Sequence, residues 1–127
     1  MTKSPNHTFL MLGGLFALLS VALGAFGAHA LKEAMPANFM ANYQTGVQYQ
    51  MMHSLGLIAV GLAAAVLPDT GHLRRAGWSM AIGIVLFSGS LYVLSLTQIT
   101  KLGAITPLGG VAFLYGWLSL MLAARKK

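Results

Sequence analysis

The residues of this chain that could carry chemistry are concentrated in two apolar stretches, one around His53 and one around Tyr92. His53 follows Tyr49 and Gln50 by about one helical turn, so the three side chains would lie close together on a helix. An imidazole held in apolar surroundings can relay protons or respond to pH near neutrality. The alternative is structural: a neutral His53 hydrogen-bonded to Tyr92 or Ser88 would fix the register of two helices.

The sequence contains few of the residue combinations that enzymatic catalysis requires. A serine nucleophile such as Ser54 beside His53 would need an acid to orient the histidine, and the only acidic residues are Glu33 and Asp69. His29 and His53 lack the carboxylate or thiolate support of a metal site, and the chain has no cysteine. We therefore expect no enzymatic activity, no catalytic residue, no metal and no cofactor.

The elements that would hold these residues are membrane-spanning helices. Hydrophobic residues make up 57% of the 127-residue chain and charged residues 8%, far below the roughly 25% typical of soluble proteins. Four apolar runs each reach the roughly 20 residues that a helix needs to cross a bilayer. They are Phe9 to Ala28, Tyr43 to Leu67, Ala76 to Thr97 and Gly103 to Ala124. The prediction is an all-α integral membrane four-helix bundle, with residues 1–127 as a single transmembrane domain.

The basic residues predict the orientation of these spans. Six of the eight lysines and arginines lie in the N-terminal tail, between the second and third runs, and at the C-terminus. With an even number of spans these regions share one side of the membrane, and by the positive-inside rule that side is cytoplasmic. Both termini are therefore expected in the cytoplasm, with Lys32 and Lys101 on the outer side. Nucleic acid is not an expected partner, because no basic face with interleaved aromatic residues could follow a phosphate backbone.

On this topology the polar residues of the spans gather in the outer half of the bundle, whereas the inner half is almost purely apolar. A polar side chain in hydrocarbon costs several kcal/mol unless it is paired. This cluster should therefore converge on itself or on a wet cavity that binds a ligand. Lys101 and the free N–H groups at the start of the fourth span would also suit an anion. The candidate ligand-binding residues are Tyr49, Gln50, His53, Ser88, Tyr92, Lys101 and Thr106.

Small residues form a stripe along one face of the first span and another along the fourth. A small-residue face lets a second helix approach closely, so each stripe marks a packing surface, inside one subunit or between two copies. The helix-packing candidates are Gly13, Ala17, Ser20, Gly24 and Gly27 in the first span, and Gly109, Ala112 and Gly116 in the fourth.

Prolines predict where two of the helices begin. A helix that starts near Pro36 would run on through the second apolar run for about 30 residues, so its first two turns would project beyond the hydrocarbon or lie at the interface. The fourth helix should start with Thr106 as its N-cap and Pro107 as its first residue.

Several separate motifs, in the right order, resemble those of a known family. They are Gly24-Ala25-Phe26-Gly27-Ala28-His29, Tyr49-Gln50-Met51-Met52-His53, Phe87 to Tyr92, Thr97-Gln98-Ile99, Gly103 to Gly110 and Gly116-Trp117. From about Phe9 to Ala123 the chain resembles the small membrane proteins of domain-of-unknown-function family 423, the YgdD-like family. The resemblance implies a four-helix, multi-pass protein of the bacterial inner membrane with no established catalytic activity, and it supplies no catalytic residues.

Two functional hypotheses follow from these observations. In the first, the chain is a small non-enzymatic membrane protein that stabilises or assembles with another membrane protein, or with itself, through its small-residue faces and outer polar cluster. In the second, the polar cluster binds or conducts a small ligand, a lipid or a quinone, with His53 and Tyr92 as polar contacts. The lipid bilayer is a partner in both hypotheses.

Overall fold

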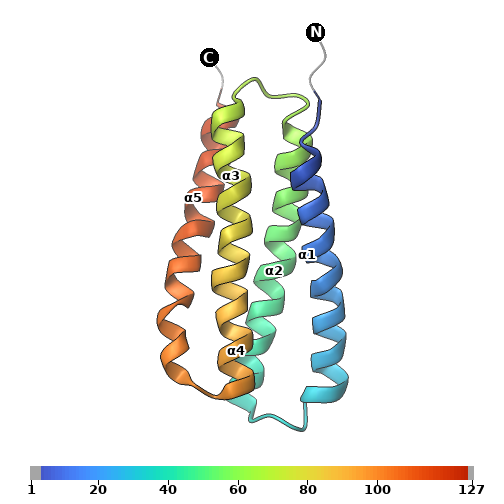
Figure 1. Cartoon of the computed structure of the whole chain (residues 1–127), viewed down its shortest axis with the longest axis vertical. Helices are drawn as coiled ribbons and strands as arrows, with labels where there is room; N and C mark the ends of the chain where they lie inside the picture. Colours follow the sequence, from blue (N-terminus) through green and yellow to red (C-terminus); the bar gives the residue numbers. More distant parts are fainter. Residues whose placement is uncertain (1–3, 126–127) are drawn as a thin grey trace.

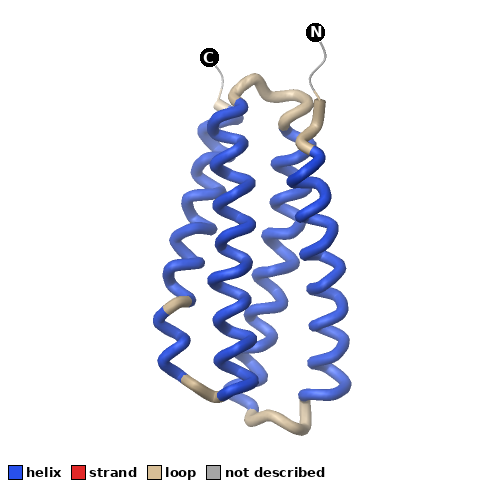
Figure 2. Tube along the Cα trace, viewed as in Figure 1, coloured by secondary structure: helices blue, strands red, loops and turns tan. Residues whose placement is uncertain are grey.

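The chain folds into a bundle of helices. The computed structural model describes residues 4–125, and these residues contain no strand (Figure 2). The helices are α1 His7–Phe26, α2 Ala37–Ala63, α3 Thr70–Gly83, α4 Gly89–Thr97 and α5 Thr106–Ala124, and between them lie the short helical segments η1 Gly27–Leu31, η2 Ile84–Ser88 and η3 Thr100–Ala104. Because η2 is a π-helical turn that joins α3 to α4 in one rod, the described chain makes four antiparallel passes (Figure 1).

Three of the four passes are long and apolar enough to cross a membrane. They are His7–Leu31, Thr70–Thr97 and Thr100–Ala124. The remaining pass, α2, is long enough at 27 residues. Its polar side chains make it less apolar than the other three, so it is not among the candidate spans. Gln50 and His53 of this helix are buried, whereas Gln44 and Gln48 are exposed. The inward polar side chains belong to the interior of the bundle, while the outward pair faces its surroundings.

The ends of the helices depart from the apolar runs where a cap or another contact decides the boundary. α3 begins before its apolar run because Asp69 accepts a hydrogen bond from the His72 amide at 3.1 Å and so caps the helix. α2 begins immediately after Pro36, as its sequence predicts, and ends at Ala63. The prediction of Thr106 as N-cap of α5 is wrong, since Ile105 occupies that position and the Thr106 hydroxyl is hydrogen-bonded to the Ser90 hydroxyl at 2.6 Å.

The small-residue stripe of α1 packs against α2. A Cβ added at Gly13 would lie 2.6 Å from Ile58 Cγ1 and 2.8 Å from the Ser54 carbonyl oxygen, and one added at Gly24 would lie 3.3 Å from Val47. Of the other members, Gly27 contacts Tyr43, Ser20 is buried and Ala17 is half-buried. The stripe therefore brings two backbones of the same subunit together.

The stripe of α5 packs in the same way against α3 and η2. Gly109 lies directly against the backbone of Phe87, and a Cβ at Gly116 would lie 3.0 Å from Met80 Cγ. Ala112 is half-buried on the same helix. Consequently α1 and α5 occupy the two edges of the molecule, with α2 and the α3–α4 rod between them (Figure 1). Neither stripe is left open on the surface.

The interior is divided along its length. The apolar core includes Phe9, Leu57, Val60, Leu73 and Ala123, which lie near those ends of α1, α2, α3 and α5 where the described chain begins and finishes. Of the buried polar side chains, Ser88, Ser90 and Ser95 lie toward the opposite end, Gln50 and His53 lie near the middle of α2, and Ser119 lies near the end of α5.

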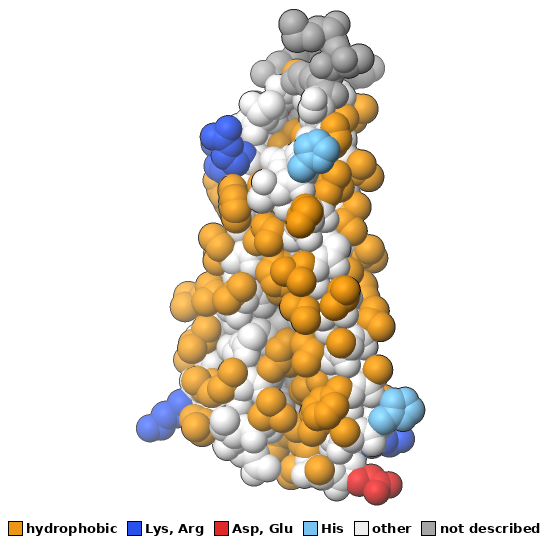
Figure 3. All heavy atoms as spheres, turned by 45° about the vertical axis from the view of Figure 1, so that its right-hand side comes forward, with side chains coloured by type: hydrophobic (Ala, Val, Ile, Leu, Met, Phe, Trp, Pro, Cys, Tyr) orange, Lys and Arg blue, Asp and Glu red, His pale blue; other side chains and the backbone are white. Residues whose placement is uncertain are grey.

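The surface along the length of the bundle is hydrophobic, and the charged side chains lie near its two ends (Figure 3). Large apolar side chains are strongly exposed, for example Met11 at 75% and Leu114 at 72%, which is the reverse of a soluble protein and typical of a lipid-facing surface. Arg74, Arg75 and Arg125 belong to the end that holds both chain ends, whereas Lys32, Glu33 and Lys101 belong to the other end. The predicted topology residues Lys3, Lys126 and Lys127 fall outside the described residues.

Candidate functional site

Gln50 is the centre of the buried polar network. Its side-chain amide donates a hydrogen bond to the Phe16 carbonyl oxygen at 2.9 Å, and its side-chain oxygen accepts one from the Tyr92 hydroxyl at 2.5 Å. One residue of α2 is thereby connected to both α1 and α4. Because both polar atoms of the amide are paired, Gln50 and Tyr92 act within the fold as interhelical links.

The neighbouring hydroxyl groups also find their partners within the described protein. Ser88 donates to the Gly46 carbonyl oxygen at 2.6 Å, Ser54 to the Gln50 carbonyl oxygen at 2.5 Å, and Tyr43 to the Leu23 carbonyl oxygen at 2.6 Å. Ser95 is the exception, because its buried hydroxyl has no hydrogen-bond partner in the described part of the chain. The polar cluster thus converges on itself and leaves few free groups for a ligand.

His53 faces α5. It is 2% exposed, its Nδ1 lies 2.7 Å from the Tyr49 carbonyl oxygen, and its Nε2 lies 2.9 Å from the indole Nε1 of Trp117. An indole N–H can only donate, so Nε2 accepts and Nδ1 carries the proton. The expectation that His53 pairs with Tyr92 or Ser88 is wrong, since those side chains are bonded to Gln50 and Gly46 instead. The imidazole is held neutral and in one tautomer.

Aromatic rings surround this histidine. The Phe113 ring stacks on the imidazole with centroids 3.5 Å apart and planes 9° apart. The Trp117 ring lies 5.6 Å away at 57°, and the Tyr49 and Phe87 rings are 4.6 Å apart. These contacts join α2, η2 and α5 through flat, rigid side chains.

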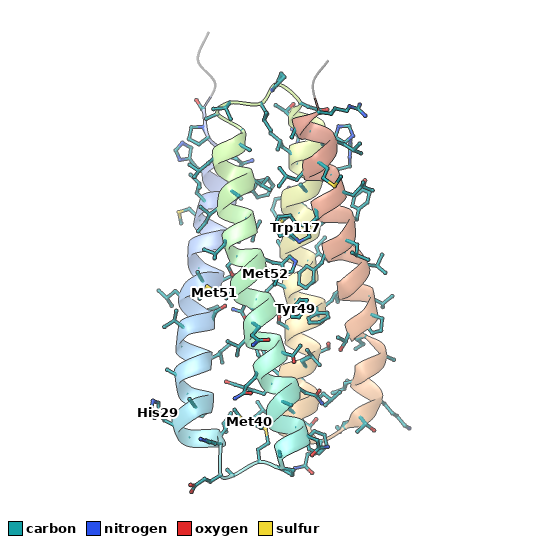
Figure 4. The ribbon with its side chains drawn as sticks, turned by 180° about the vertical axis from the view of Figure 1, so that it is seen from behind. His29, Met40, Tyr49, Met51, Met52 and Trp117 are labelled. Carbon is teal, nitrogen blue, oxygen red and sulfur yellow. The ribbon has the colours of Figure 1, made fainter. Side chains whose placement is uncertain are left out.

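The rings line a groove of about 450 Å³ between α2 and α5. Tyr49 and Trp117 come from the two helices on either side of it (Figure 4). The lining residues are Tyr49, Met52, His53, Phe87, Pro107, Gly110, Val111, Phe113, Leu114 and Trp117. The groove is open on the hydrophobic flank of the molecule, so we call it the α2–α5 groove and regard it as accessible from a bilayer.

Tyr49 carries the polar group of the α2–α5 groove that is left unpaired. Its side chain is 36% exposed, and its hydroxyl has no hydrogen-bond partner among residues 4–125. Tyr49 lies near the middle of the 27-residue α2. A hydroxyl at that depth in hydrocarbon is unfavourable without an acceptor, so the groove offers one unused donor on an apolar, aromatic surface.

A second groove of about 340 Å³ lies on the other flank, between α1 and the α3–α4 rod. Its walls include Phe16, Trp78 and Ile82, and all of its lining residues are hydrophobic. No hydroxyl group lines this α1–α3 groove. It therefore provides an internal comparison for the α2–α5 groove, similar in size and different in hydrogen bonding.

The remaining candidates from the sequence lie elsewhere. Lys101 is exposed in η3 and Thr106 is bonded to Ser90, and neither lines the α2–α5 groove. Phe113 and Trp117 are groove residues that the sequence analysis did not name as candidate ligand contacts. Their spacing of four on one helix is a usable signal, but an aromatic pair in a membrane helix is equally typical of lipid contact. Within the described chain, no three His, Cys, Asp or Glu residues could share a metal ion.

Comparison with known proteins identifies the family. The family model described as a protein of unknown function, DUF423, matches residues 23–110. Curated relatives include a UPF0382 membrane protein, YwdK, of Bacillus subtilis, 55% identical over 93% of this chain and 96% of the relative. UPF0382 membrane proteins of Staphylococcus epidermidis and Staphylococcus aureus are 47% and 42% identical over 93% of this chain and 95% of each relative.

None of these names states an enzymatic activity. No solved structure is significantly similar to the chain. The matched region contains the end of α1, all of α2, α3 and α4, and the start of α5, so the family resemblance proposed from the sequence motifs is confirmed. The chain is a membrane protein that belongs to the DUF423 family.

Proposed function

We propose that this protein is a non-enzymatic, four-pass membrane protein that binds a flat, lipid-soluble carbonyl compound, with the chemistry of a quinone ring, in the α2–α5 groove. The observation that carries the proposal is the unpaired Tyr49 hydroxyl in an otherwise apolar, aromatic groove. A ring carbonyl would accept that hydrogen bond, while the remaining rings would contact the ligand's faces.

The four-pass arrangement rests on the path of the chain. α1 and the α3–α4 rod run in the same direction (Figure 1), so the chain must return along α2 between them. The end with Arg74, Arg75 and Arg125 is assigned to the cytoplasm by the positive-inside rule. Both termini are then cytoplasmic, and the protein is a multi-pass component of the bacterial inner membrane.

Binding is favoured over assembly through the small-residue stripes because those stripes are already filled. Gly13 and Gly24 face α2, and Gly109 and Gly116 face the α3–α4 rod. A partner helix could use them only by displacing a helix of the same subunit. The α2–α5 groove, in contrast, is open and requires no rearrangement.

The lack of free reactive groups favours binding over catalysis. Both ring nitrogens of His53 are occupied, and neither Glu33 nor Asp69 lines the groove. No charged residue lines it either, so an uncharged ligand suits it better than an anion or a cation. The proposed role is to hold, present or carry the ligand within the membrane.

Tryptophan fluorescence in lipid nanodiscs tests the proposal. Trp78→Phe leaves Trp117 as the reporter of the α2–α5 groove, and Trp117→Phe leaves Trp78 as the reporter of the α1–α3 groove. Titration with a short-chain menaquinone should quench Trp117 with a saturable curve, whereas quenching of Trp78 should rise in proportion to the added quinone. Equal, unsaturable quenching of both tryptophans would overturn the proposal.

The contribution of the hydroxyl is tested by Tyr49→Phe in the Trp78→Phe background. Loss of one neutral hydrogen bond, about 1 kcal/mol, should weaken quinone binding about fivefold. Tyr115→Phe is the matched control, because Tyr115 is 46% exposed on α5 and does not line the groove.

Groove volume is tested separately by Gly110→Leu. The nearest atom to a Cβ at Gly110 is 4.0 Å away, so the new side chain should enter the groove without a backbone clash and abolish saturable quenching. Gly14→Leu, at a position with nothing within 4 Å of the added Cβ, should leave binding unchanged.

A further inference from the structure

The outward face of α2 differs from the other membrane-facing surfaces of the molecule. Gln44 and Gln48 lie one turn apart and are both exposed, and neither side-chain amide makes a hydrogen bond with any residue of the described chain. The same stripe continues with Met52 and Leu55, which are 50% and 56% exposed. It is therefore polar in the half near the start of α2 and apolar in the other half.

These amides lie at the depth of the membrane span. Gln44 and Gln48 border a shallow depression of about 350 Å³ together with Gly24 and Val47. Gly24 belongs to the candidate span His7–Leu31, and the seven residues from it to the end of that span correspond to roughly 10 Å of helix. Lipid chains cannot hydrogen-bond an amide, and each unsatisfied group at this depth costs free energy.

We propose that a second copy of this chain covers the Gln44–Gln48 face, in a parallel dimer whose two α2 helices lie side by side. All copies share one orientation in the membrane, so a two-fold axis along the membrane normal brings the same residues together at the same depth. Gln44 then meets its counterpart, and Gln48 does the same. Each amide has both donors and an acceptor, so two copies are complementary by construction.

The depression beside the amides adds room for close packing. Its walls include Gly24 on the α1 side and the flexible Met40 on the α2 side. A side chain from the facing α2 can enter there without displacing either helix. Gln44 and Gln48 border α1 and do not line the α2–α5 groove, although Met52, farther along the same stripe, does.

Cysteine cross-linking in native membranes tests this geometry directly, because the chain contains no cysteine of its own. Gln48→Cys should form a disulfide-linked dimer on mild oxidation. Val21→Cys is the matched control: Val21 is 63% exposed on α1 and lies less than one turn from Gly24, at nearly the same depth. It should remain monomeric under the same oxidation.

The energetic test uses Förster transfer between donor- and acceptor-labelled copies in liposomes at increasing dilution. Gln44→Leu combined with Gln48→Leu should raise the dimer dissociation constant roughly tenfold through the loss of the interhelical amide bonds. Tryptophan quenching by menaquinone should stay unchanged, which separates this proposal from the ligand proposal.

Three results would overturn the second copy as occupant. In the first, the wild-type chain is monomeric at all dilutions. In the second, a dimer forms but Gln48→Cys does not cross-link and the double variant does not weaken the dimer. In the third, the Gln48→Cys chain cross-links only to a different protein. The last result would identify a heterologous partner for the same face.

Discussion

Gln50 makes hydrogen bonds to two other helices, and these bonds change its expected role from ligand contact to structural link. An amide in a membrane helix is a candidate ligand contact when only the sequence is considered. Its bonds to Phe16 and Tyr92 make it a structural link, while the exposed Tyr49, its neighbour in sequence, keeps a free hydroxyl. The inward direction of Gln50 and His53 could be predicted from helical spacing. Their partners could not, because these depend on the rotation of α4 and α5.

A double-mutant cycle on Gln50→Leu and Tyr92→Phe measures this link. Each single change should destabilise the protein by about 1 kcal/mol, and the coupling energy should be about 0.6 kcal/mol, the average for interhelical hydrogen bonds in membranes. Reversible unfolding in mixed micelles gives the required free energies. Tyr115→Phe serves as the reference, and a coupling energy near zero would show that the 2.5 Å contact contributes nothing.

The tautomer of His53 is a second prediction at this scale. Nitrogen-15 NMR at pH 7 should show a protonated Nδ1 and an unprotonated Nε2, because Trp117 donates to Nε2. Trp117→Phe removes that donor and should give a mixture of tautomers. A single Nε2-protonated form in the wild type would contradict the geometry.

At the scale of elements, the glycine stripes decide which helices pair. The stripes were visible in the sequence, but whether they face inside one subunit or between two depends on which neighbour each helix meets. The start of α2 after Pro36 was predictable from the proline. The N-cap of α5 was not, because the Thr106 hydroxyl is drawn to Ser90 on α4, a contact between segments distant in sequence.

Adjacent glycines in α1 allow a matched test of this packing. Gly13→Ala should destabilise the protein by about 1–3 kcal/mol, since the new methyl would lie 2.8 Å from the Ser54 carbonyl oxygen and the helices would have to separate. Gly14→Ala has nothing within 4 Å and should be neutral or slightly stabilising. Unfolding of both variants in the same mixed micelles decides the point, and equal effects would argue against close α1–α2 packing.

At the scale of the whole molecule, composition predicted an all-helical membrane protein, and charge placement predicted its orientation. The α2–α5 groove was beyond such reasoning, because it results from the distance between two helices that are not consecutive in the chain. Phe113 and Trp117 form part of its wall through contacts with His53, some sixty residues earlier in the sequence. The spacing of residues in the sequence shows which side chains share a face of one helix, but it does not determine the distance between two helices.

Orientation is tested by labelling single cysteines in intact cells. Glu33→Cys lies in the loop between α1 and α2 and should react with a membrane-impermeant maleimide from outside, whereas Arg75→Cys, near the start of α3, should react only after permeabilisation. The opposite pattern would invert the topology. Labelling of both residues from one side would show that α2 does not cross the membrane.

The π-helical turn η2 has a consequence for insertions and deletions in this family. It places one more residue in a turn than an α-helix does, so every residue after it is rotated by about 100° relative to an uninterrupted helix. Deleting one residue of the turn, such as the 60%-exposed Val85, would restore a regular helix and leave Tyr92 facing Gln50, because the lost residue and the lost extra rotation cancel. The α3–α4 rod can therefore lose one residue at η2 and keep the direction of every side chain in α4, whereas the same deletion in an uninterrupted helix would turn every later side chain by about 100°.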